Sequence, residues 1–337
     1  MGANLFADSV VCLDAATGVR KWHFQTVHHG LWDYDNPGPP MLVTINVDGK
    51  KIDAVVQLTK QGFAFVFDRV TGKPVWPIEE RPVPVSDVQG EKSWPTQPFP
   101  TKPPAFAPQG VTLADANDLT PAIKEASLAE LKKLRLGPLF TPPSMEGTLA
   151  RPSTVGGADW SGGGFDPETG IVYIKVNANG IVLTPRIADK DGNVKPIDNA
   201  AGGGRYAIRG VPIIKPPYGF LSAVDLNHGT LIYQKPFGDD ARLRANPALA
   251  GVKLPEKLGV VGNSGLIVTK GGLLFVGGGD EAVHAVDKKT GEDLWVYPTP
   301  GLRTSGTPMT FAIGNKQYVV IAVGGDGAEP TLLAFSL

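Results

Sequence analysis

Three segments of the sequence hold ionisable side chains where chemistry could take place. Trp32-Asp33-Tyr34-Asp35 carries two carboxylates, Lys60 follows an apolar strand-like run, and Asp280 follows three glycines. A carboxylate can accept a proton, and an ammonium can stabilise an oxygen anion. Glycine also lets the backbone approach a ligand closely. Ordinary roles fit the same residues, since an aspartate can cap a turn and a lysine can be a solvated surface charge.

Charge and histidine content narrow the classes of partner. The chain has 32 basic and 33 acidic residues, scattered along its length, and a net charge of −1. Such a balance does not indicate the basic surface that binds nucleic acid, and it fits a neutral small-molecule substrate better. The 5 histidines show no zinc spacing. His28 and His29 fit two roles equally well. They could line the entrance of a substrate site, or they could form hydrogen bonds with polar groups at strand ends.

A recurring hairpin supplies the elements that must position these residues. Each copy reads apolar strand, Asp, two residues, Thr-Gly, three residues and Trp, with the aromatic eight residues after the Asp. The copies are VCLDAATGVRKW (Asp14 to Trp22), FVFDRVTGKPVW (Asp68 to Trp76), HAVDKKTGEDLW (Asp287 to Trp295) and, with Tyr in place of Trp, SAVDLNHGTLIY (Asp225 to Tyr233).

The repeat predicts an all-β propeller. The Asp carboxylate can accept turn N–H groups, Gly takes a positive φ, and the aromatic can fill the gap between neighbouring sheets. One such hairpin per four-stranded unit is typical of a propeller rather than of unrelated hairpins. Further strands are expected in 163–176, 316–325 and 331–337.

One segment differs from the strand pattern. After a Pro-rich stretch, Thr120-Pro121 opens a helix with leucines at helical spacing, and Gly137-Pro138 closes it. We interpret residues 81–143 as a long insert on one face of a single domain that spans 1–337.

Length and composition fit a globular chain whose beginning lies upstream. The 337 residues are 42% hydrophobic and include one cysteine, Cys12, so no disulfide forms within the chain. No apolar run approaches the ~20 residues of a membrane span, and the N-terminus has no signal-peptide pattern. Because strand pattern begins by Ser9, we expect that an upstream portion is missing.

Several longer motifs resemble the membrane-associated, glucose dehydrogenase-like branch of the quinoprotein dehydrogenases, which use pyrroloquinoline quinone (PQQ). The Asp-x-x-Thr-Gly-x-x-x-Trp repeat is itself the PQQ-enzyme repeat, and the resemblance runs nearly end to end. It implies an eight-bladed propeller, of which about five blades are visible here, with PQQ near the axis beside a divalent cation. The other motifs are VHHGLWDYDNPGPP (27–40), PTQPFPTKP (95–103), LFTPPSMEGTL (139–149) and GTPMTFAIGNKQYVVIAVGG (306–325).

The resemblance also implies roles for residues. Asp33 matches the family's general base, and Lys60 matches a residue that contacts the quinone oxygens. Asp33 and Asp35 are the candidate ligands of the metal, Ca²⁺ or Mg²⁺, with a lanthanide also compatible. Asp35 fits structural capping equally well.

Four further residues match positions that face the cofactor in the family. They are Asp280, Asp159, Trp160 and Asn177. The match around Asn177 needs a gap, and Lys175 stands where the family commonly has an asparagine.

The implied function is oxidation of a sugar such as glucose, or of an alcohol, with electrons passed to a quinone or a cytochrome. The implied location is periplasmic, with membrane association through the missing N-terminal part. Two alternatives stay open: an inactive fragment of such an enzyme, and a non-catalytic scaffold of the same repeats that binds proteins. We expect that this chain alone does not form a closed, active propeller without the missing N-terminal blades.

Overall fold

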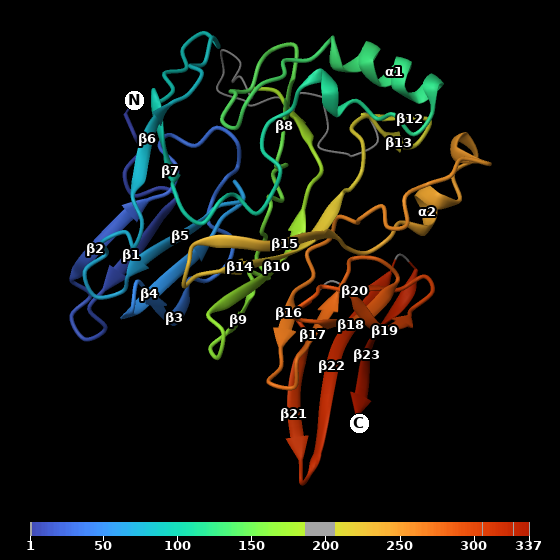
Figure 1. Cartoon of the computed structure of the whole chain (residues 1–337). Coiled ribbons are helices and arrows are strands. Elements are labelled where there is room, and N and C mark those ends of the chain that lie inside the picture. Colours follow the sequence, from blue (N-terminus) through green and yellow to red (C-terminus); the bar gives the residue numbers. More distant parts are fainter. Residues whose placement is uncertain (1, 186–205, 305, 326, 337) are drawn as a thin grey trace.

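A computed structural model of the chain describes residues 2–185, 206–304, 306–325 and 327–336. Within these ranges, antiparallel strands dominate, and they gather into separate small sheets. Figure 1 shows the sheets succeeding one another in chain order, from the blue N-terminal strands to the red C-terminal strands. This row of sheets confirms the predicted all-β architecture of a partial propeller with about five blades.

Five sheets form the blades, and they are numbered here in chain order. The first sheet holds β1 (Ser9–Leu13) and β2 (Arg20–Gln25), and the second holds β3 (Met41–Val47), β4 (Lys50–Leu58) and β5 (Ala64–Asp68). The third sheet holds β9 (Gly164–Asp166), β10 (Ile171–Asn177), β14 (Gly219–Asp225) and β15 (Thr230–Pro236), and the fourth holds β16 (Leu266–Val268), β17 (Leu273–Gly277), β18 (Ala282–Asp287) and β19 (Asp293–Pro298). The fifth sheet holds β20 (Arg303–Thr304), β21 (Met309–Ile313), β22 (Lys316–Gly325) and β23 (Ala328–Ser336).

The Asp-Thr-Gly turns fold as their residue types predict. The Asp68 carboxylate accepts N–H bonds from Val70 at 3.1 Å and Thr71 at 2.8 Å, and Gly72 has a φ of 71°. The Thr71 N–H bond lowers the pKa of Asp68 because it stabilises the carboxylate. Equivalent aspartate–backbone bonds form at Asp14, Asp225 and Asp287.

The aromatic residues that end the first three hairpins each pack on the turn of the next sheet. The Trp22 indole donates to the Arg69 carbonyl at 3.1 Å, and a Cβ on Gly72 would lie 2.6 Å from the Trp22 ring. The Tyr233 hydroxyl likewise donates to the Lys288 carbonyl at 3.2 Å. The gap-filling role predicted for these aromatics is therefore seen at successive sheet junctions, and Trp76 packs in the same way on Gly229.

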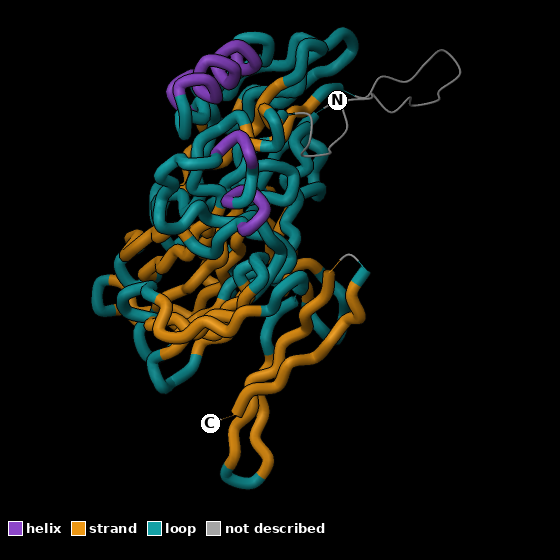
Figure 2. The backbone as a smooth tube through the Cα atoms, turned by 90° about the vertical axis from the view of Figure 1, so that its right-hand side faces the viewer, coloured by secondary structure: helices purple, strands orange, loops and turns teal. Residues whose placement is uncertain are grey.

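The connections between sheets carry the helices and the remaining strands. Figure 2 shows helices and many loops gathered above the strands, and a C-terminal hairpin that projects below them. None of the described helices is long and apolar enough to cross a membrane. These connecting elements are β6 (Ile78–Pro82), β7 (Thr96–Pro100), η1 (Leu113–Asp115), α1 (Pro121–Leu131), β8 (Thr148–Ala150), β11 (Ile181–Leu183), β12 (Ala207–Ile208), β13 (Val211–Pro212), α2 (Ala241–Arg244) and η2 (Pro247–Leu249).

Helix α1 begins where predicted and ends early. The Thr120 hydroxyl accepts the Ile123 N–H at 3.1 Å, so it caps the helix as its type and place indicate. The helix stops at Leu131, well before Gly137. Arg135 instead exchanges backbone bonds with the segment that enters β8, and this pairing replaces further helical turns. The boundaries 81–143 for a separate insert stay a prediction.

Candidate functional site

A buried lysine and two carboxylates meet beyond the end of β4. The Lys60 ammonium lies 2.6 Å from Asp35 Oδ1 and 3.4 Å from Asp33 Oδ2. The Lys60 side chain is 9% exposed, against 64% for Asp33 and 51% for Asp35. The structure thus brings together the three residues that the Trp-Asp motif and the lysine motif single out, with the cation inside and the carboxylates toward solvent.

Alternating burial orients the two carboxylates. Trp32 and Tyr34 are buried, and their polar atoms donate to the Thr141 carbonyl at 2.8 Å and the Pro152 carbonyl at 2.6 Å. With these two side chains anchored inside, Asp33 and Asp35 remain on the exposed side of the segment. Asp33 has a φ of 61°, a conformation that costs energy for a side chain other than glycine.

A third carboxylate, Asp8, acts on the same charges. Burial and then the negative charges of Asp35 and Asp33 raise the pKa of Asp8, while Lys60 opposes the rise. Partial burial also raises the pKa of Asp33, again against the effect of Lys60. Sequence reasoning did not identify Asp8, because it belongs to no motif and only tertiary folding brings it near Asp33 and Asp35.

A run of backbone hydrogen bonds joins Lys60 to Asn177. The Gly157 N–H donates to the Lys60 carbonyl at 2.8 Å, and the Asn177 N–H donates to the Gly157 carbonyl at 3.0 Å. A Cβ on Gly156 would lie only 2.4 Å from Lys60 Cγ, so the loop lies directly against the lysine. The end of β10 is thereby held beside the end of β4.

The Asn177 side chain extends this connection to the fourth sheet. Its Oδ1 accepts the Gly262 N–H at 3.0 Å and the Lys175 ammonium at 2.9 Å. Gly262 in turn packs on Gly279, the residue before Asp280. Residues of three successive sheets are therefore joined by one run of contacts. Sequence reasoning noted Lys175 only for its residue type and did not predict its contact with Asn177.

Asp280 lies in a buried ionic cluster. Its carboxylate accepts the Asp239 N–H at 3.0 Å and lies 3.2 Å from His284 Nε2. His284 Nδ1 lies 3.1 Å from Asp293 Oδ1. Burial disfavours the imidazolium, but hydrogen bonds to Asp280 and Asp293 outweigh it and raise the pKa of His284 to about 9. Asp280 is thus committed to an internal partner.

Asp159 and Trp160 lie in the loop that contains Gly157. Asp159 Oδ1 accepts the Trp160 N–H at 2.7 Å, and its negative charge also acts on Lys175. The Trp160 side chain is 49% exposed and joins none of the apolar clusters among the described residues. Its ring is therefore the least constrained of the predicted site residues.

Both histidines of the Val27–Pro40 motif are held by the β6–β7 region. His28 Nε2 lies 2.9 Å from Glu80, and His29 Nε2 lies 2.7 Å from Glu91. Their Nδ1 atoms contact Gln25 Oε1 and the Gly2 carbonyl. All four ring nitrogens have protein partners, which favours the structural role for this pair.

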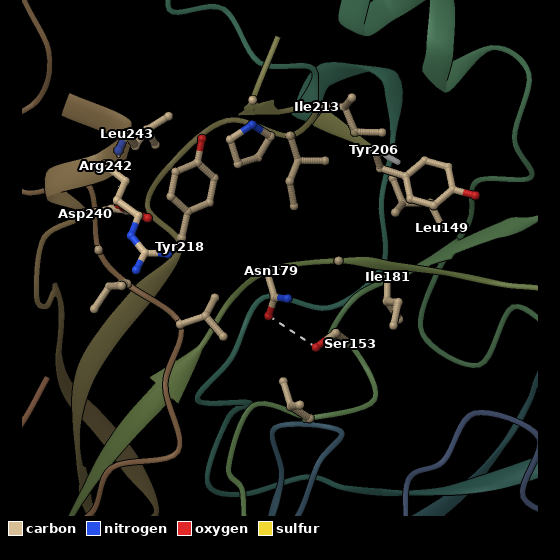
Figure 3. A pocket seen from close by; sticks show the side chains of 18 of the residues that line it. Leu149, Ser153, Asn179, Ile181, Tyr206, Ile213, Tyr218, Asp240, Arg242 and Leu243 are labelled. Atoms are coloured by element: carbon tan, nitrogen blue, oxygen red, sulfur yellow. Dashed lines mark hydrogen bonds between the residues drawn. The ribbon is translucent and has the colours of Figure 1, made fainter. Parts of the chain in front are cut away.

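A cavity of about 630 Å³ borders the site. Its wall includes Val155, Asn179 and Val261, which are chain neighbours of the segments that hold Lys60 and Asn177 in place. Figure 3 shows Asp240, Arg242 and Tyr218 at one side of this cavity and Tyr206 and Leu149 at the other. The 2–185, 206–304, 306–325 and 327–336 ranges contain no cluster of three or more His, Cys, Asp or Glu side chains arranged for a metal.

Comparisons with known proteins agree with this architecture. Residues 1–319 match the family described as "PQQ: Glucose/ethanol/alcohol dehydrogenase, beta-propeller domain". A probable quinate dehydrogenase (quinone) of Xanthomonas campestris pv. juglandis is 34% identical over 98% of this chain and 45% of its own length. Quinoprotein glucose dehydrogenase A of Acinetobacter calcoaceticus is 33% identical over 98% of this chain and 44% of its own length.

A solved structure gives the same result. The quinohemoprotein alcohol dehydrogenase from Comamonas testosteroni superposes with a TM-score of 0.57 and 25% identity, over 96% of this chain and 39% of that one. The chain therefore spans less than half the length of these relatives.

Proposed function

The chain belongs to the PQQ-dependent dehydrogenase β-propeller family, and from this premise we propose that it forms the Asp33–Lys60 side of a site that oxidises a sugar or another alcohol. Relatives named for quinate, glycerol and glucose support a hydroxylated small molecule as substrate. Two relatives named with quinone as acceptor support electron transfer to a quinone, and a cytochrome is the alternative acceptor. The periplasm is the proposed location.

The residues present suit PQQ, an ortho-quinone that bears carboxylates. Lys60 offers a nearly buried ammonium to an anionic oxygen, and Asn177 offers amide hydrogens that bond to no described residue. Gly156 leaves no room for a side chain against Lys60, which keeps the loop close to the proposed cofactor position. Asp280, Asp159 and Trp160 are proposed to border the same position.

Asp33 is the group best placed to accept a proton. Its carboxylate is open to solvent on one side, and its raised pKa makes it a better base than an ordinary aspartate. Lys60, 3.4 Å away, orients it from the inside. When bound, PQQ would supply the carbon that accepts the hydride, and Lys60 would stabilise negative charge on the adjacent oxygen.

A divalent cation is proposed to join Asp33 and Asp35. These two carboxylates contact one ammonium, and the nearby Asp8 adds a third negative charge, an excess that would attract a cation. Ca²⁺ and Mg²⁺ both suit carboxylate oxygens, and a lanthanide is also compatible. Further ligands would have to come from outside the described residues.

The single observation that carries the proposal is the contact of a buried Lys60 with two outward carboxylates. We expect Lys60→Met to weaken PQQ binding, measured by tryptophan fluorescence titration, by at least tenfold. In the complete propeller, Asp33→Asn should keep PQQ affinity but lower dye-linked turnover on the order of 10²- to 10⁴-fold. Lys21→Met, which removes an exposed ammonium, is the control. Equal PQQ affinity in wild type and Lys60→Met would contradict the placement of the cofactor.

A further inference from the structure

Lys175 is buried in the third sheet with its charge fully coordinated by oxygen. The residue lies in β10 and is 4% exposed. Its ammonium donates to Asn177 Oδ1 at 2.9 Å, the Val260 carbonyl at 2.8 Å and the Gly262 carbonyl at 3.1 Å. Three hydrogens thus meet three acceptors. No carboxylate lies within ion-pair distance of this ammonium among the residues the structure describes, so its purpose is not a salt bridge.

The ammonium decides which way the Asn177 amide faces. Asn177 Oδ1 receives one hydrogen from Lys175 and another from the Gly262 backbone at 3.0 Å. Both partners are donors, so the amide nitrogen cannot occupy that side. Both lone pairs of the oxygen are used, and the two Nδ2 hydrogens must point the other way.

The outward side of Asn177 belongs to the proposed cofactor position. Its backbone is tied to Lys60 through Gly157, and its side chain is 2% exposed. No described residue accepts a hydrogen bond from Nδ2, whereas Oδ1 has two donors. A ligand acceptor at this place would complete its hydrogen bonding.

We infer that Lys175 is a positioning residue, which locks the Asn177 amide so that Nδ2 is presented to an acceptor oxygen of the cofactor. The inference rests on the proposed function for the identity of the ligand, but the lock itself is a property of the ligand-free protein. Burial lowers the pKa of Lys175 to about 7, and the negative charges of Asp280 and Asp159 oppose that lowering. The inference itself rests on the three hydrogen bonds of the Lys175 nitrogen.

The ligand-free protein provides the first test. The Nδ2 hydrogens of Asn177 are identified in ¹⁵N-labelled protein as the side-chain pair that disappears in Asn177→Ala. In wild type we expect one sharp pair, and in Lys175→Met a displaced and broadened pair, because the amide can then rotate. Lys175→Gln, which keeps a donor, should restore a sharp pair. An unchanged pair in Lys175→Met would overturn the lock.

A double-mutant cycle with PQQ provides the second test. Lys175→Met is expected to weaken PQQ binding about tenfold, the loss of one well-oriented hydrogen bond. In an Asn177→Ala background the same change should have no further effect, because Lys175 acts only through Asn177. Lys270→Met, which removes an exposed ammonium, should leave the affinity unchanged.

The outcomes separate the two hypotheses. Equal losses from Lys175→Met in both backgrounds would mean that Lys175 only supports the fold, and would overturn the inference. Failure of the wild-type residues to bind PQQ in the complete propeller would count against the proposed function instead, and the ¹⁵N measurement would still decide whether Lys175 fixes the amide.

Discussion

At the scale of single residues, buried ionic partners hold the site more than its exposed acids do. His284 is the clearest case, since it lies between Asp280 and Asp293, with the Phe237 ring 4.8 Å from its own and Lys257 bound to Asp293. Its imidazolium connects Asp280, which is proposed to border the cofactor, to Asp293 on β19. His284 is therefore the buried ionic partner of Asp280.

We predict a pH dependence of stability from this pair. The pKa of His284 is raised from 6.5 to about 9, so the stabilisation is complete below about pH 6.5 and is lost as the pH rises through 9. The difference in free energy of unfolding between wild type and His284→Gln should be on the order of a few kcal/mol at pH 6 and should shrink toward pH 9.5. Urea unfolding at several pH values measures it.

His228→Gln is the matched control, because it removes an imidazole whose side chain is 75% exposed. Its effect on the free energy of unfolding should be small throughout the same range. A difference for His284→Gln that stays constant from pH 6 to 9.5 would show that the imidazole is neutral in the folded protein.

At the scale of elements, the glycine of the hairpin turn does two separable things. Gly18 and Gly72 occupy the same position in the repeat, with φ values of 70° and 71°. A Cβ on Gly18 would meet nothing within 4 Å, whereas one on Gly72 would meet the Trp22 ring at 2.6 Å. A substitution at Gly18 therefore tests backbone strain alone, whereas a substitution at Gly72 also tests the contact between sheets.

We expect Gly18→Ala to lower the free energy of unfolding by about 1 kcal/mol, the usual cost of a positive φ for alanine. Gly72→Ala should cost about 1–3 kcal/mol more, because the ring must move. Chemical denaturation followed by circular dichroism gives both values, and Trp22 fluorescence should shift only in Gly72→Ala. Equal losses in the free energy of unfolding for the two variants would mean that the Trp22 ring can move away from residue 72 at little cost.

Local sequence patterns made the hairpin turns and the start of α1 predictable, whereas several contacts of the candidate site could not be predicted from them. The Asp68 turn and the Thr120 cap depend on residues within a few positions, so the sequence indicates them directly. The early end of α1 depends on pairing of Arg135 with the β8 strand. Asp8 and Lys175 matter because remote segments fold against them, and no spacing in the chain encodes such contacts.

At the scale of the whole molecule, the fifth sheet presents apolar side chains to solvent. Phe311 and Ile313 on β21 and Leu332 on β23 are 44%, 65% and 65% exposed. Figure 2 shows the hairpin that carries β21 projecting from the body. Soluble proteins rarely leave such a surface uncovered, so this sheet is suited to association.

We predict that the purified chain self-associates through this surface. Light scattering coupled to size exclusion should give a mass that rises with concentration, and Phe311→Asp combined with Ile313→Asp should lower it. Leu42→Asp, which changes a 69% exposed leucine on β3, should leave association unchanged. A constant monomer mass at every concentration would contradict the prediction.

The contact of three hairpin aromatics with the turn of the following sheet also has a consequence for synthesis on the ribosome. A hairpin aromatic leaves the ribosome before the turn that covers it has been translated. Trp22 is covered by Gly72, Tyr233 by Gly291, and Trp76 by the much later Gly229. The second sheet therefore keeps its indole uncovered longest, because the helical segment and three of the four strands of the third sheet are translated first. A nascent chain paused in that interval would be the form most in need of a chaperone.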